Sequence, residues 1–549
     1  EQNKADYRAG KYNETQVRRE FLDPFFKALG WDVDNEQGYA EAYKDVVHEA
    51  TVIVGEATKA PDYAFRIGGT RKFFVEAKKP SVNIKDDIAP AFQTRRYAWS
   101  AKLPLSILTD FEEFAVYDCR VKPHKNDKAS TARVMYFTYD EYLSKWDEIA
   151  AIFSRDAVLK GSFDKYASSK KKQRGTAEVD DAFLEEIERW RELLARNIAL
   201  RNKNALSPRQ LNEAVQLTID RIIFLRIAEG RGAEIYGQLQ DIAENQNPGF
   251  SKKPGFSGEE KPGFSVYEGL TTLYKKADAR YNSGLFHFGA NGDSFTLDLQ
   301  IDDKVLKDIL GHLYYPDSPY VFSEIPADIL GQVYERFLGK VIRLTPSGQA
   351  KVEEKPEVRK AGGVYYTPTY IVDYIVEHTV GALLEGKTPK TAEKLKIIDP
   401  ACGSGTFLLG AFEHLIQWHL KWYVADDPSK WAKKGVLVEG REGWDLTLDE
   451  KKNILTNNLY GVDIDAQAVE VTKLSLLLKV IETPGQLGML AERILPDLSA
   501  NVKCGNSLIG SDYYHDKQMP LLGDEEFWRV NAFDWQRSFA GIFAQGGFD

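Results

Sequence analysis

The sequence contains little cysteine and no long apolar segment. Its three cysteines, Cys119, Cys402 and Cys504, are far apart and form no Cys-x-x-Cys pair. This argues against a disulfide framework or a zinc site and for a reducing compartment. No apolar run reaches the ~18 residues of a membrane span, and residues 1–4 do not resemble a signal peptide. We therefore expect a cytoplasmic protein with no membrane partner.

A surplus of positive charge is also absent. The 72 lysines and arginines are outnumbered by 82 acidic residues, so the 549-residue chain has a formal net charge of −10. Binding to nucleic acid would therefore need local basic faces. At about 100–200 residues per domain, the length predicts three or more domains.

Residues 395–412 predict a strand, a tight turn and the start of a helix. The turn, Asp-Pro-Ala-Cys-Gly-Ser-Gly at residues 399–405, has glycines that let the backbone approach a ligand, and N–H groups at a helix start favour an anionic group. A dinucleotide site needs Gly-x-Gly-x-x-Gly, but Leu408 replaces the third glycine. Asp399 suits an amine better than a pyrophosphate, so S-adenosylmethionine fits best. An ordinary strand, turn and helix is the alternative.

A second informative stretch, residues 61–78, predicts a β-hairpin around a Gly-Gly-Thr loop. With a three-residue loop, Ile67 faces Arg71 and Asp62 faces Glu76. Side chains alternate between the two faces of a strand. We therefore expect the neighbours of Glu76 to point away from it into a core: Phe73, Val75 and Ala77.

The hairpin would gather two carboxylates and one ammonium group, because Glu76 and Lys78 share a face of the strand. Such a cluster is costly unless a cation lies between the acids. A Mg²⁺ ion held by Asp62 and Glu76 would polarise a scissile phosphate, and Lys78 would orient or help deprotonate an attacking water. A solvated strand with a salt bridge is the plainer alternative.

This Pro-Asp, Glu-x-Lys arrangement resembles the PD-(D/E)xK nuclease superfamily. Glu14, in a predicted helix capped by Asn13, matches a glutamate that several restriction nucleases carry near the metal. Gln93 and Tyr97, four residues apart on a predicted helix, match the Gln-x-x-x-Tyr element of RecB-like and Type I restriction nucleases. The resemblance implies this fold over residues 1–155, with catalytic positions at Asp62, Glu76, Lys78, Glu14 and Gln93.

Arg95 and Arg96 lie on the same predicted helix and could contact DNA phosphates. Strands are expected at residues 105–108 and 114–117. A decayed copy of the nuclease that does not cut is the competing interpretation.

The middle of the chain predicts a polar linker over residues 156–180 and an all-α connector over residues 181–345. The basic run near residue 171 is more typical of a solvated hinge than of a DNA contact. Helices are expected to resume over residues 325–344, after a loop with three Pro-Gly-Phe-Ser copies. No Gly-x-x-x-x-Gly-Lys-Ser/Thr helicase loop is present. Three arginines are expected to pair with nearby acids rather than with phosphates: Arg221, Arg226 and Arg231, with Asp220 and Glu229.

Further along, Thr367 predicts a helix N-cap and Pro368 a first helical residue. The apolar face of this helix is expected to be buried: Ile371, Val372, Ile375 and Val376. Gly-Val-Asp-Ile-Asp at residues 461–465 ends a predicted strand, where an acid takes a ribose diol; Asp463 is our first choice and Asp465 the second. The acid lies much further from Asp399 than the usual ~20 residues, so we expect an insertion near residues 422–449.

Tyr-Tyr-Thr-Pro, Asp-Pro-Ala-Cys-Gly-Ser-Gly-Thr, Gly-Val-Asp-Ile-Asp and Cys-Gly-Asn-Ser together resemble the γ-class N6-adenine DNA methyltransferases. This implies a Rossmann-like domain over residues 346–549 that uses S-adenosylmethionine. By position, Thr367 and the backbone of residues 401–403 would hold the methionine end, Asp399 the amine, Asp463 the ribose and Asn506 the adenine. The implied cofactor-binding positions are Tyr366, Thr367, Pro368, Asp399, Pro400, Ala401, Cys402, Gly403, Gly405, Asp463, Ile464 and Asn506.

One feature of that class is missing. Its Asn/Asp-Pro-Pro-Tyr/Phe tetrapeptide, which binds the flipped adenine, does not occur in the sequence. Residues 546–549 resemble the run into the strand that would carry it. We therefore expect residues 346–549 to be the N-terminal part of a methyltransferase domain that binds cofactor but does not methylate without the remainder.

A nuclease, a connector and a γ-class methyltransferase in one chain resemble the single-chain Type IIG/IIL restriction–modification enzymes, an α/β multidomain class. The resemblance implies N6-adenine methylation and Mg²⁺-dependent cutting of double-stranded DNA outside the recognition site. A homodimer on DNA is one arrangement that would cut both strands. Two alternatives stay open: a phage-defence methyltransferase with a non-cutting nuclease-like domain, and a non-catalytic subunit that uses S-adenosylmethionine as a ligand.

Overall fold

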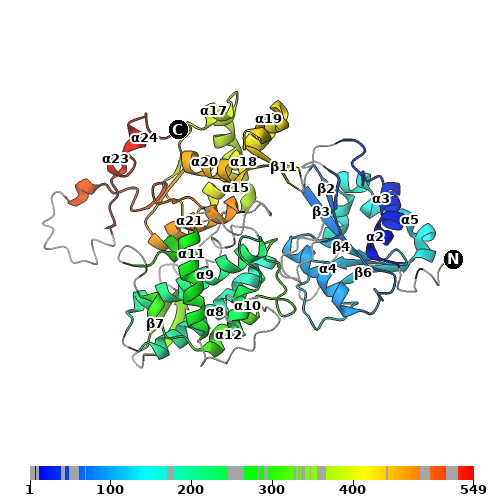
Figure 1. The fold of residues 1–549 in the computed structure, drawn as a ribbon, viewed down its shortest axis with the longest axis horizontal. Coiled ribbons are helices and arrows are strands. Elements are labelled where there is room, and N and C mark those ends of the chain that lie inside the picture. The colour runs from blue at the N-terminus through cyan, green and yellow to red at the C-terminus, as the bar shows by residue number, and fades with distance from the viewer. Residues whose placement is uncertain are drawn as a thin grey trace, which may run out of the picture. The chain divides into compact units, whose positions relative to one another are not determined.

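The computed structural model (Figure 1) divides into two units. The first unit comprises Glu1–Phe183, Gly311–Ile325 and Arg441–Gly443, and the second comprises Leu184–Leu310, Pro326–Gly440 and Trp444–Asp549. The domain boundaries inferred from the sequence stay predictions. The structure describes residues 7, 12–38, 44–48, 61–68, 70–169, 178–203, 205–244, 265–281, 284–289, 293, 295–325, 329, 331, 334, 340–345, 348–354, 367–440, 443–481, 495–514 and 530–549.

A six-stranded mixed sheet lies at the centre of the first unit. Its strands pair in chain order: β1 (Val46–His48), β2 (Tyr63–Ile67), β3 (Thr70–Ala77), β4 (Leu105–Thr109), β5 (Glu113–Asp118) and β6 (Arg133–Thr138). Neighbouring strands are antiparallel except β3 and β4, which are parallel. A parallel pair needs a crossover connection, and helix α4 (Ile88–Ser100) supplies it. The strands expected at residues 105–108 and 114–117 are confirmed.

Helices cover both faces of this sheet. On β3, Phe73, Val75 and Ala77 belong to one core, as expected, whereas Phe74 belongs to another core with Tyr97 of α4. Figure 1 shows α3 and α5 on the side of the sheet away from α4. The other helices of the unit are α2 (Glu14–Val17), the π-helical turn η1 (Arg18–Leu22), α3 (Asp23–Ala28), η3 (Tyr139–Glu141), α5 (Tyr142–Phe153), α6 (Arg155–Leu159) and α7 (Ser162–Ser169).

The second unit begins with a group of helices. The expected helices are confirmed as α8 (Val179–Arg201) and α9 (Pro208–Gly230), and Ser207 caps α9. They are followed by α10 (Gln238–Ala243), α11 (Val266–Tyr281), η4 (Gly284–Phe286), η5 (Thr296–Asp298) and α12 (Asp303–Gly311). The Pro-Gly-Phe-Ser copies and most of the basic run near residue 171 lie outside the described residues. None of the described helices is long and apolar enough to cross a membrane.

The all-α prediction for the connector is wrong at its end. Residues expected to finish a helix form β7 (Lys340–Leu344), which pairs with β8 (Ala350–Glu354) in an antiparallel hairpin. The sequence Lys-Val-Ile-Arg-Leu contains two adjacent β-branched residues, which favour a strand, and Ile342 is its buried residue. Gly348, at a φ of +80°, allows the turn between the strands.

A three-stranded parallel sheet follows, with β12 (Leu459–Asp463) between β9 (Ile397–Asp399) and β13 (Val502–Cys504). Asp549 donates its N–H to the carbonyl oxygen of Lys396, just before β9 (3.0 Å). The remaining elements are α15 (Thr369–Val376), η6 (Glu377–Gly381), α16 (Ala382–Leu384), α17 (Pro389–Ala392), α18 (Thr406–Asp426), α19 (Pro428–Lys433), β10 (Leu437–Gly440), β11 (Gly443–Leu446), α20 (Leu448–Asn458), α21 (Ala466–Val480), η7 (Ser511–Tyr514), α23 (Trp535–Ser538) and α24 (Ala540–Phe543).

Removal of the Phe73 ring should destabilise the first unit. Phe73 is fully buried and stacks on Phe65, with ring centroids 4.6 Å apart. Phe73→Ala should lower the free energy of unfolding by about 3–5 kcal/mol, because it leaves a cavity in a packed core. Urea unfolding followed by circular dichroism measures this. The control is Leu143→Ala, since Leu143 is 95% exposed; an equal loss in both variants would contradict the packing argument.

Candidate functional site

The hairpin of β2 and β3 brings Asp62 and Glu76 to one end of the first unit's sheet. Tyr63 pairs with Val75 across the hairpin. Asp62, the residue before Tyr63, therefore lies opposite Glu76, the residue after Val75. This is the pairing that the sequence predicted.

The loop end of the hairpin differs from the prediction. Ile67 pairs with Thr70 rather than with Arg71, so the loop is one residue shorter. Gly68 has a φ of +58°, and two-residue hairpin turns favour such left-handed residues. A one-residue shift in register after Phe65, which is a β-bulge, restores the predicted pairing at the acids.

The carboxylate of Glu76 is buried and only half satisfied. Its Oε1 accepts hydrogen bonds from Lys78 Nζ (2.5 Å) and from Gln93 Nε2 (3.0 Å). Its Oε2 is buried without a hydrogen-bond partner among the described residues. Burial raises the pKa of Glu76 to about 7. The charge of Lys78 opposes this rise, and the charge of Asp62 adds to it. A buried carboxylate oxygen without a donor is costly to the fold and is a ready ligand for a cation.

Asp62 is held from two directions. Its Oδ2 accepts the N–H of Ala77 (2.8 Å), and its Oδ1 accepts a hydrogen bond from Arg18 Nη1 (3.2 Å). Burial raises the pKa of Asp62, and the charge of Arg18 opposes this rise. Arg18 was not among the predicted site residues. Its position four residues after Glu14, on the same helical face, was the signal that could have identified it.

Lys78 and Glu14 complete the charged cluster. Burial lowers the pKa of Lys78, but the charge of Glu76 and its neighbours outweighs burial and raises the pKa overall. Lys78 is therefore a cation here, suited to orienting a water molecule and offsetting negative charge. Glu14, near the start of α2, contributes to the raised pKa values of Asp62, Glu76 and Lys78.

Helix α4 presents Gln93 to this cluster, but its two arginines face elsewhere. The expectation that Arg95 and Arg96 contact DNA is wrong. Arg95 is 1% exposed and donates to Asp127 Oδ2 (2.7 Å), and Arg96 donates to the carbonyl oxygen of Tyr320 (2.9 Å). Neighbouring segments enclose both guanidinium groups, which the local sequence did not reveal.

The cluster supplies two carboxylates for a metal ion. No group of three or more His, Cys, Asp or Glu side chains able to hold a metal occurs in the described parts of the chain. Mg²⁺, however, is commonly held by one or two carboxylates, with water and substrate phosphates completing its shell. The facing pair of Asp62 and Glu76, with one buried oxygen unpaired, fits this open kind of site.

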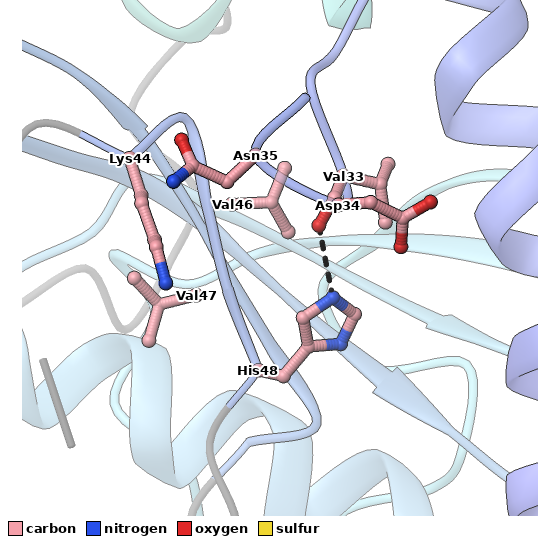
Figure 2. Close-up of a pocket in the computed structure, with 7 residues that line it drawn as sticks. All are labelled: Val33, Asp34, Asn35, Lys44, Val46, Val47 and His48. Carbon is pink, nitrogen blue, oxygen red and sulfur yellow. Dashed lines mark hydrogen bonds between the residues drawn. The ribbon is translucent and has the colours of Figure 1, made fainter. Parts of the chain in front are cut away.

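A hollow of about 280 Å³ opens beside β1 (Figure 2). None of the predicted site residues lines it. Arg18 Nη2 lies 3.1 Å from Nδ1 of His48, and because a guanidinium only donates, the His48 proton is on Nε2, facing the carbonyl oxygen of Val33 (3.1 Å). The lining residues are Val33, Asp34, Asn35, Lys44, Val46, Val47 and His48.

In the second unit, a tightly braced turn joins β9 to α18. Gly403 and Gly405 have φ angles of +53° and +86°. A Cβ atom on Gly405 would lie 2.8 Å from Thr472 Cγ2, and Thr472 Oγ1 donates to the carbonyl oxygen of Gly403 (2.8 Å). Cys402 N donates to the carbonyl oxygen of Val462 in β12 (3.0 Å). Glycine is therefore required where helix α21 approaches the turn.

Two acids flank this turn at the carboxyl ends of β9 and β12. Asp399 Oδ1 accepts the N–H of Ala401 (3.1 Å), and burial, with the charge of Asp463, raises the pKa of Asp399. Asp463 accepts the N–H groups of Gly403 and Asp465, at 2.9 Å each, on different oxygens. Each Asp463 oxygen keeps a second lone pair for a ligand, whereas Asp465 caps the N-terminus of α21.

The next strand end brings Asn506 near Ile464. Ile464 follows Asp463 and is 49% exposed, and the N–H of Asn506 donates to the carbonyl oxygen of Asn531 (2.6 Å). The side chain of Asn531 donates to the carbonyl oxygen of Ile464 (3.2 Å) and to Cys504 Sγ (3.3 Å). Asn531 therefore joins the ends of two strands. The sequence did not predict this role, since residue 531 is distant from every recognised motif.

The Tyr-Tyr-Thr-Pro motif is only partly described, because Tyr366 lies outside the described residues. Helix α15 begins at Thr369 with Pro368 at the N-cap, so the prediction that Thr367 caps the helix is wrong by one residue. A proline N-cap has no side-chain donor or acceptor. Val372 and Val376 are buried as expected, but Ile375 is 39% exposed.

The connector arginines are internal, but not all of them have the partners that the sequence predicted. Arg226 lies 3.7 Å from Glu229, in agreement with the prediction. Arg221 pairs with Asp293 (2.7 Å) rather than with Asp220, which instead accepts hydrogen bonds from Gln216. Arg231 donates to the carbonyl oxygen of Leu478 (2.8 Å).

Three family models match parts of the chain. The Type I restriction enzyme R protein N terminus matches residues 43–125, the N-6 DNA Methylase matches residues 326–501, and the Eco57I restriction-modification methylase matches residues 457–549. The first match contains the hairpin with Asp62 and Glu76. The other two contain the turn after β9 and the strand ends that follow it.

Known proteins are similar along most of the chain. The Type II restriction enzyme and methyltransferase RM.Eco57I of Escherichia coli is 36% identical over 96% of this chain and 50% of that protein. The putative Type II restriction enzyme and methyltransferase RM.MjaORFECS2P of Methanocaldococcus jannaschii is 29% identical over 54% of this chain and 27% of that protein. The Type IIL restriction–modification enzyme MmeI, solved with DNA, covers 59% of this chain and 40% of its own, at 14% identity and a TM-score of 0.33.

This chain therefore spans about half the length of the Escherichia coli relative. Both the restriction-enzyme model and the methylase models match it, in that order along the chain. The sequence similarity to the Escherichia coli protein runs through both. The chain is thus similar, in its restriction-type and its methylase-type parts, to a single-chain Type II restriction enzyme and methyltransferase.

Proposed function

We propose that the protein carrying this chain is a bifunctional restriction–modification enzyme. It methylates N6 of adenine in DNA with S-adenosylmethionine, and it cuts double-stranded DNA outside its recognition site in a Mg²⁺-dependent reaction. The observation that carries the nuclease activity is the unpaired, buried Oε2 of Glu76, a residue that lies opposite Asp62 in the hairpin. This pair supports the proposal that the first unit is a PD-(D/E)xK nuclease.

Each polar residue of the cluster has a role in cutting. A Mg²⁺ ion bound by Asp62 and Glu76 would polarise the scissile phosphate. Gln93 fixes the orientation of Glu76 through its hydrogen bond to Oε1. Lys78, held beside the same oxygen, orients the attacking water and offsets charge that develops on the phosphate. Glu14 adds negative charge that favours a cation in the cluster.

The second unit supports a Rossmann-like methyltransferase domain. Its parallel order β13, β12, β9 is that of strands 3, 2 and 1 in doubly wound sheets, where ligands bind at the carboxyl ends. Asp399 suits the amine of S-adenosylmethionine, and the lone pairs left on Asp463 suit its ribose diol. Ile464 and Asn506 flank the expected place of the adenine, and Thr367 with the backbone of residues 401–403 accommodates the methionine end.

Double-stranded DNA is the substrate of both activities in this proposal, and a homodimer on DNA would allow both strands to be cut. The alternative is a phage-defence adenine methyltransferase whose nuclease-like domain does not cut. The ion pair of Lys78 with Glu76 occurs in both cases, so only a cutting assay separates them.

Lys78→Ala should abolish cutting and leave methylation intact. The full protein is incubated with phage DNA, Mg²⁺ and S-adenosylmethionine, and fragments and tritiated methyl incorporation are measured. We expect discrete fragments from the wild type and at least about a hundredfold slower cutting by the variant, because a cation is lost from the reaction centre. Lys79→Ala, at an exposed neighbour, is the control. Methylation without cutting by the wild type would establish the alternative function.

Glu76 should make the metal-free protein less stable as pH rises. Its folded pKa of about 7 exceeds its ordinary value of 4.5, so folding favours the protonated form. The stability contributed by protonated Glu76 is present below pH 4.5 and is lost as pH rises through 7. The Tm advantage of Glu76→Gln over the wild type should therefore grow between pH 4.5 and 7.5 in EDTA, and Mg²⁺ should reduce it. A Tm difference that stays constant with pH would contradict the raised pKa.

Asp463→Ala should weaken cofactor binding. The change removes the acceptor for two backbone N–H groups and the proposed ribose ligand, so the Kd of S-adenosylhomocysteine should rise at least about tenfold. Isothermal titration calorimetry measures the Kd. Asp497→Ala, at an exposed acid of the same unit, should bind like the wild type. Unchanged binding by Asp463→Ala would remove Asp463 from the cofactor site.

A further inference from the structure

The carboxylates of the two proposed metal ligands differ in whether each oxygen already has a hydrogen-bond partner. Oε2 of Glu76 has no partner among the described residues, whereas Oδ1 of Asp62 is occupied by the guanidinium of Arg18. Oδ2 of Asp62 is tied to the backbone N–H of Ala77. Each Asp62 oxygen keeps one lone pair, so a cation held by both carboxylates would lie close to the guanidinium of Arg18 whichever Asp62 oxygen it contacts.

Arg18 is fixed at this position by several contacts. Besides Oδ1, it donates through Nη2 to the backbone carbonyl oxygen of Asp62 (3.2 Å) and lies 3.1 Å from His48 Nδ1. Its guanidinium carbon is 4.7 Å from the centroid of the Tyr63 ring. The side chains of Arg18 and Asp62 are only 22% and 19% exposed, so solvent screens this pair less than a surface pair.

The helix that carries Arg18 changes its geometry at this residue. Arg18 begins the π-helical turn η1, which directly follows α2. Single π-helical turns occur frequently at functional sites because the wider turn redirects side chains. Here Arg18 and Glu14, one turn apart, bring opposite charges to the same cluster.

We propose that Arg18 is a built-in counter-ion of Asp62 that competes with the divalent cation and thereby sets the metal affinity of the nuclease. This inference rests on the proposed function, because it takes Asp62 and Glu76 as the metal ligands. In the metal-free protein Arg18 neutralises Asp62. When the cation binds, repulsion between two positive groups at one carboxylate weakens the Arg18 contact.

A displaced guanidinium would still have partners close by. His48 Nδ1 and the face of Tyr63 both contact Arg18 independently of the Asp62 carboxylate. Guanidinium groups also match phosphate oxygens in a bidentate manner. Metal binding would thus free an arginine next to the position of the scissile phosphate without leaving its charge isolated.

The test is metal affinity rather than activity. The full protein without DNA is titrated with Mn²⁺ by isothermal titration calorimetry. Arg18→Met, which keeps an apolar stem and removes the charged guanidinium, should bind Mn²⁺ about tenfold more tightly, since hydrogen bonds to charged groups contribute at least about this much. Arg18→Lys, which keeps the charge without the forked geometry, should bind with an intermediate affinity. Arg19→Met, at the exposed neighbour in η1, should bind like the wild type.

A second readout follows from the same competition. In EDTA the Tm of Arg18→Met should be lower than that of the wild type, because Asp62 loses its counter-ion, and saturating Mn²⁺ should remove the difference. Equal or weaker Mn²⁺ binding by a folded Arg18→Met variant would overturn the inference.

Asp62→Asn separates this outcome from failure of the proposed function. If Asp62→Asn loses Mn²⁺ binding while Arg18→Met is unchanged, the metal site stands and only the competition is refuted. If Asp62→Asn binds Mn²⁺ like the wild type, the proposed metal site itself is wrong, and the inference is overturned with it.

Discussion

The alternation of side chains along β3 places Glu76 on the face opposite to Phe73, Val75 and Ala77. Phe73, Val75 and Ala77 enter a core, and this fixes the register of the hairpin. Glu76 must then point to the other side, where it is buried and accepts a hydrogen bond from Gln93 of α4. A carboxylate in such surroundings needs positive partners, and Lys78 and the Gln93 amide supply only one of its two oxygens with donors.

The second unit depends on a different constraint, which is close approach of backbone to side chain. Thr472 of α21 contacts the turn between β9 and α18 at Gly405, where a Cβ atom would collide with it. The turn is therefore held against β12, and Asp463 closes it by accepting the N–H of Gly403. Because parallel strands end at the same edge of the sheet, Asp399, Asp463 and Asn506 gather there although they are far apart in sequence.

Local patterns predicted much of this arrangement. The period of two in β3, the glycines of the turn and the acids that end β9 and β12 each depend on neighbours in sequence. The predictions failed where a partner came from a distant segment. The local sequence predicted that Arg95 contacts DNA, but Asp127 and nearby carbonyl groups enclose its guanidinium. Arg221 pairs with Asp293 rather than with its sequence neighbour Asp220. The hairpin of β7 and β8 was missed because a short apolar run is compatible with a helix or a strand.

The sequence by itself determined where the proposed site residues lie along their strands and turns, because strand alternation, glycine turns and capping are local consequences of backbone geometry. It placed Asp62 opposite Glu76 even though the loop length differed by one residue, since a bulge restored the register. Only the tertiary structure decided which oxygens of those acids are occupied. That depends on Arg18 and Gln93 arriving from separate helices, and on burial, which makes an unpaired oxygen costly and therefore suited to a cation.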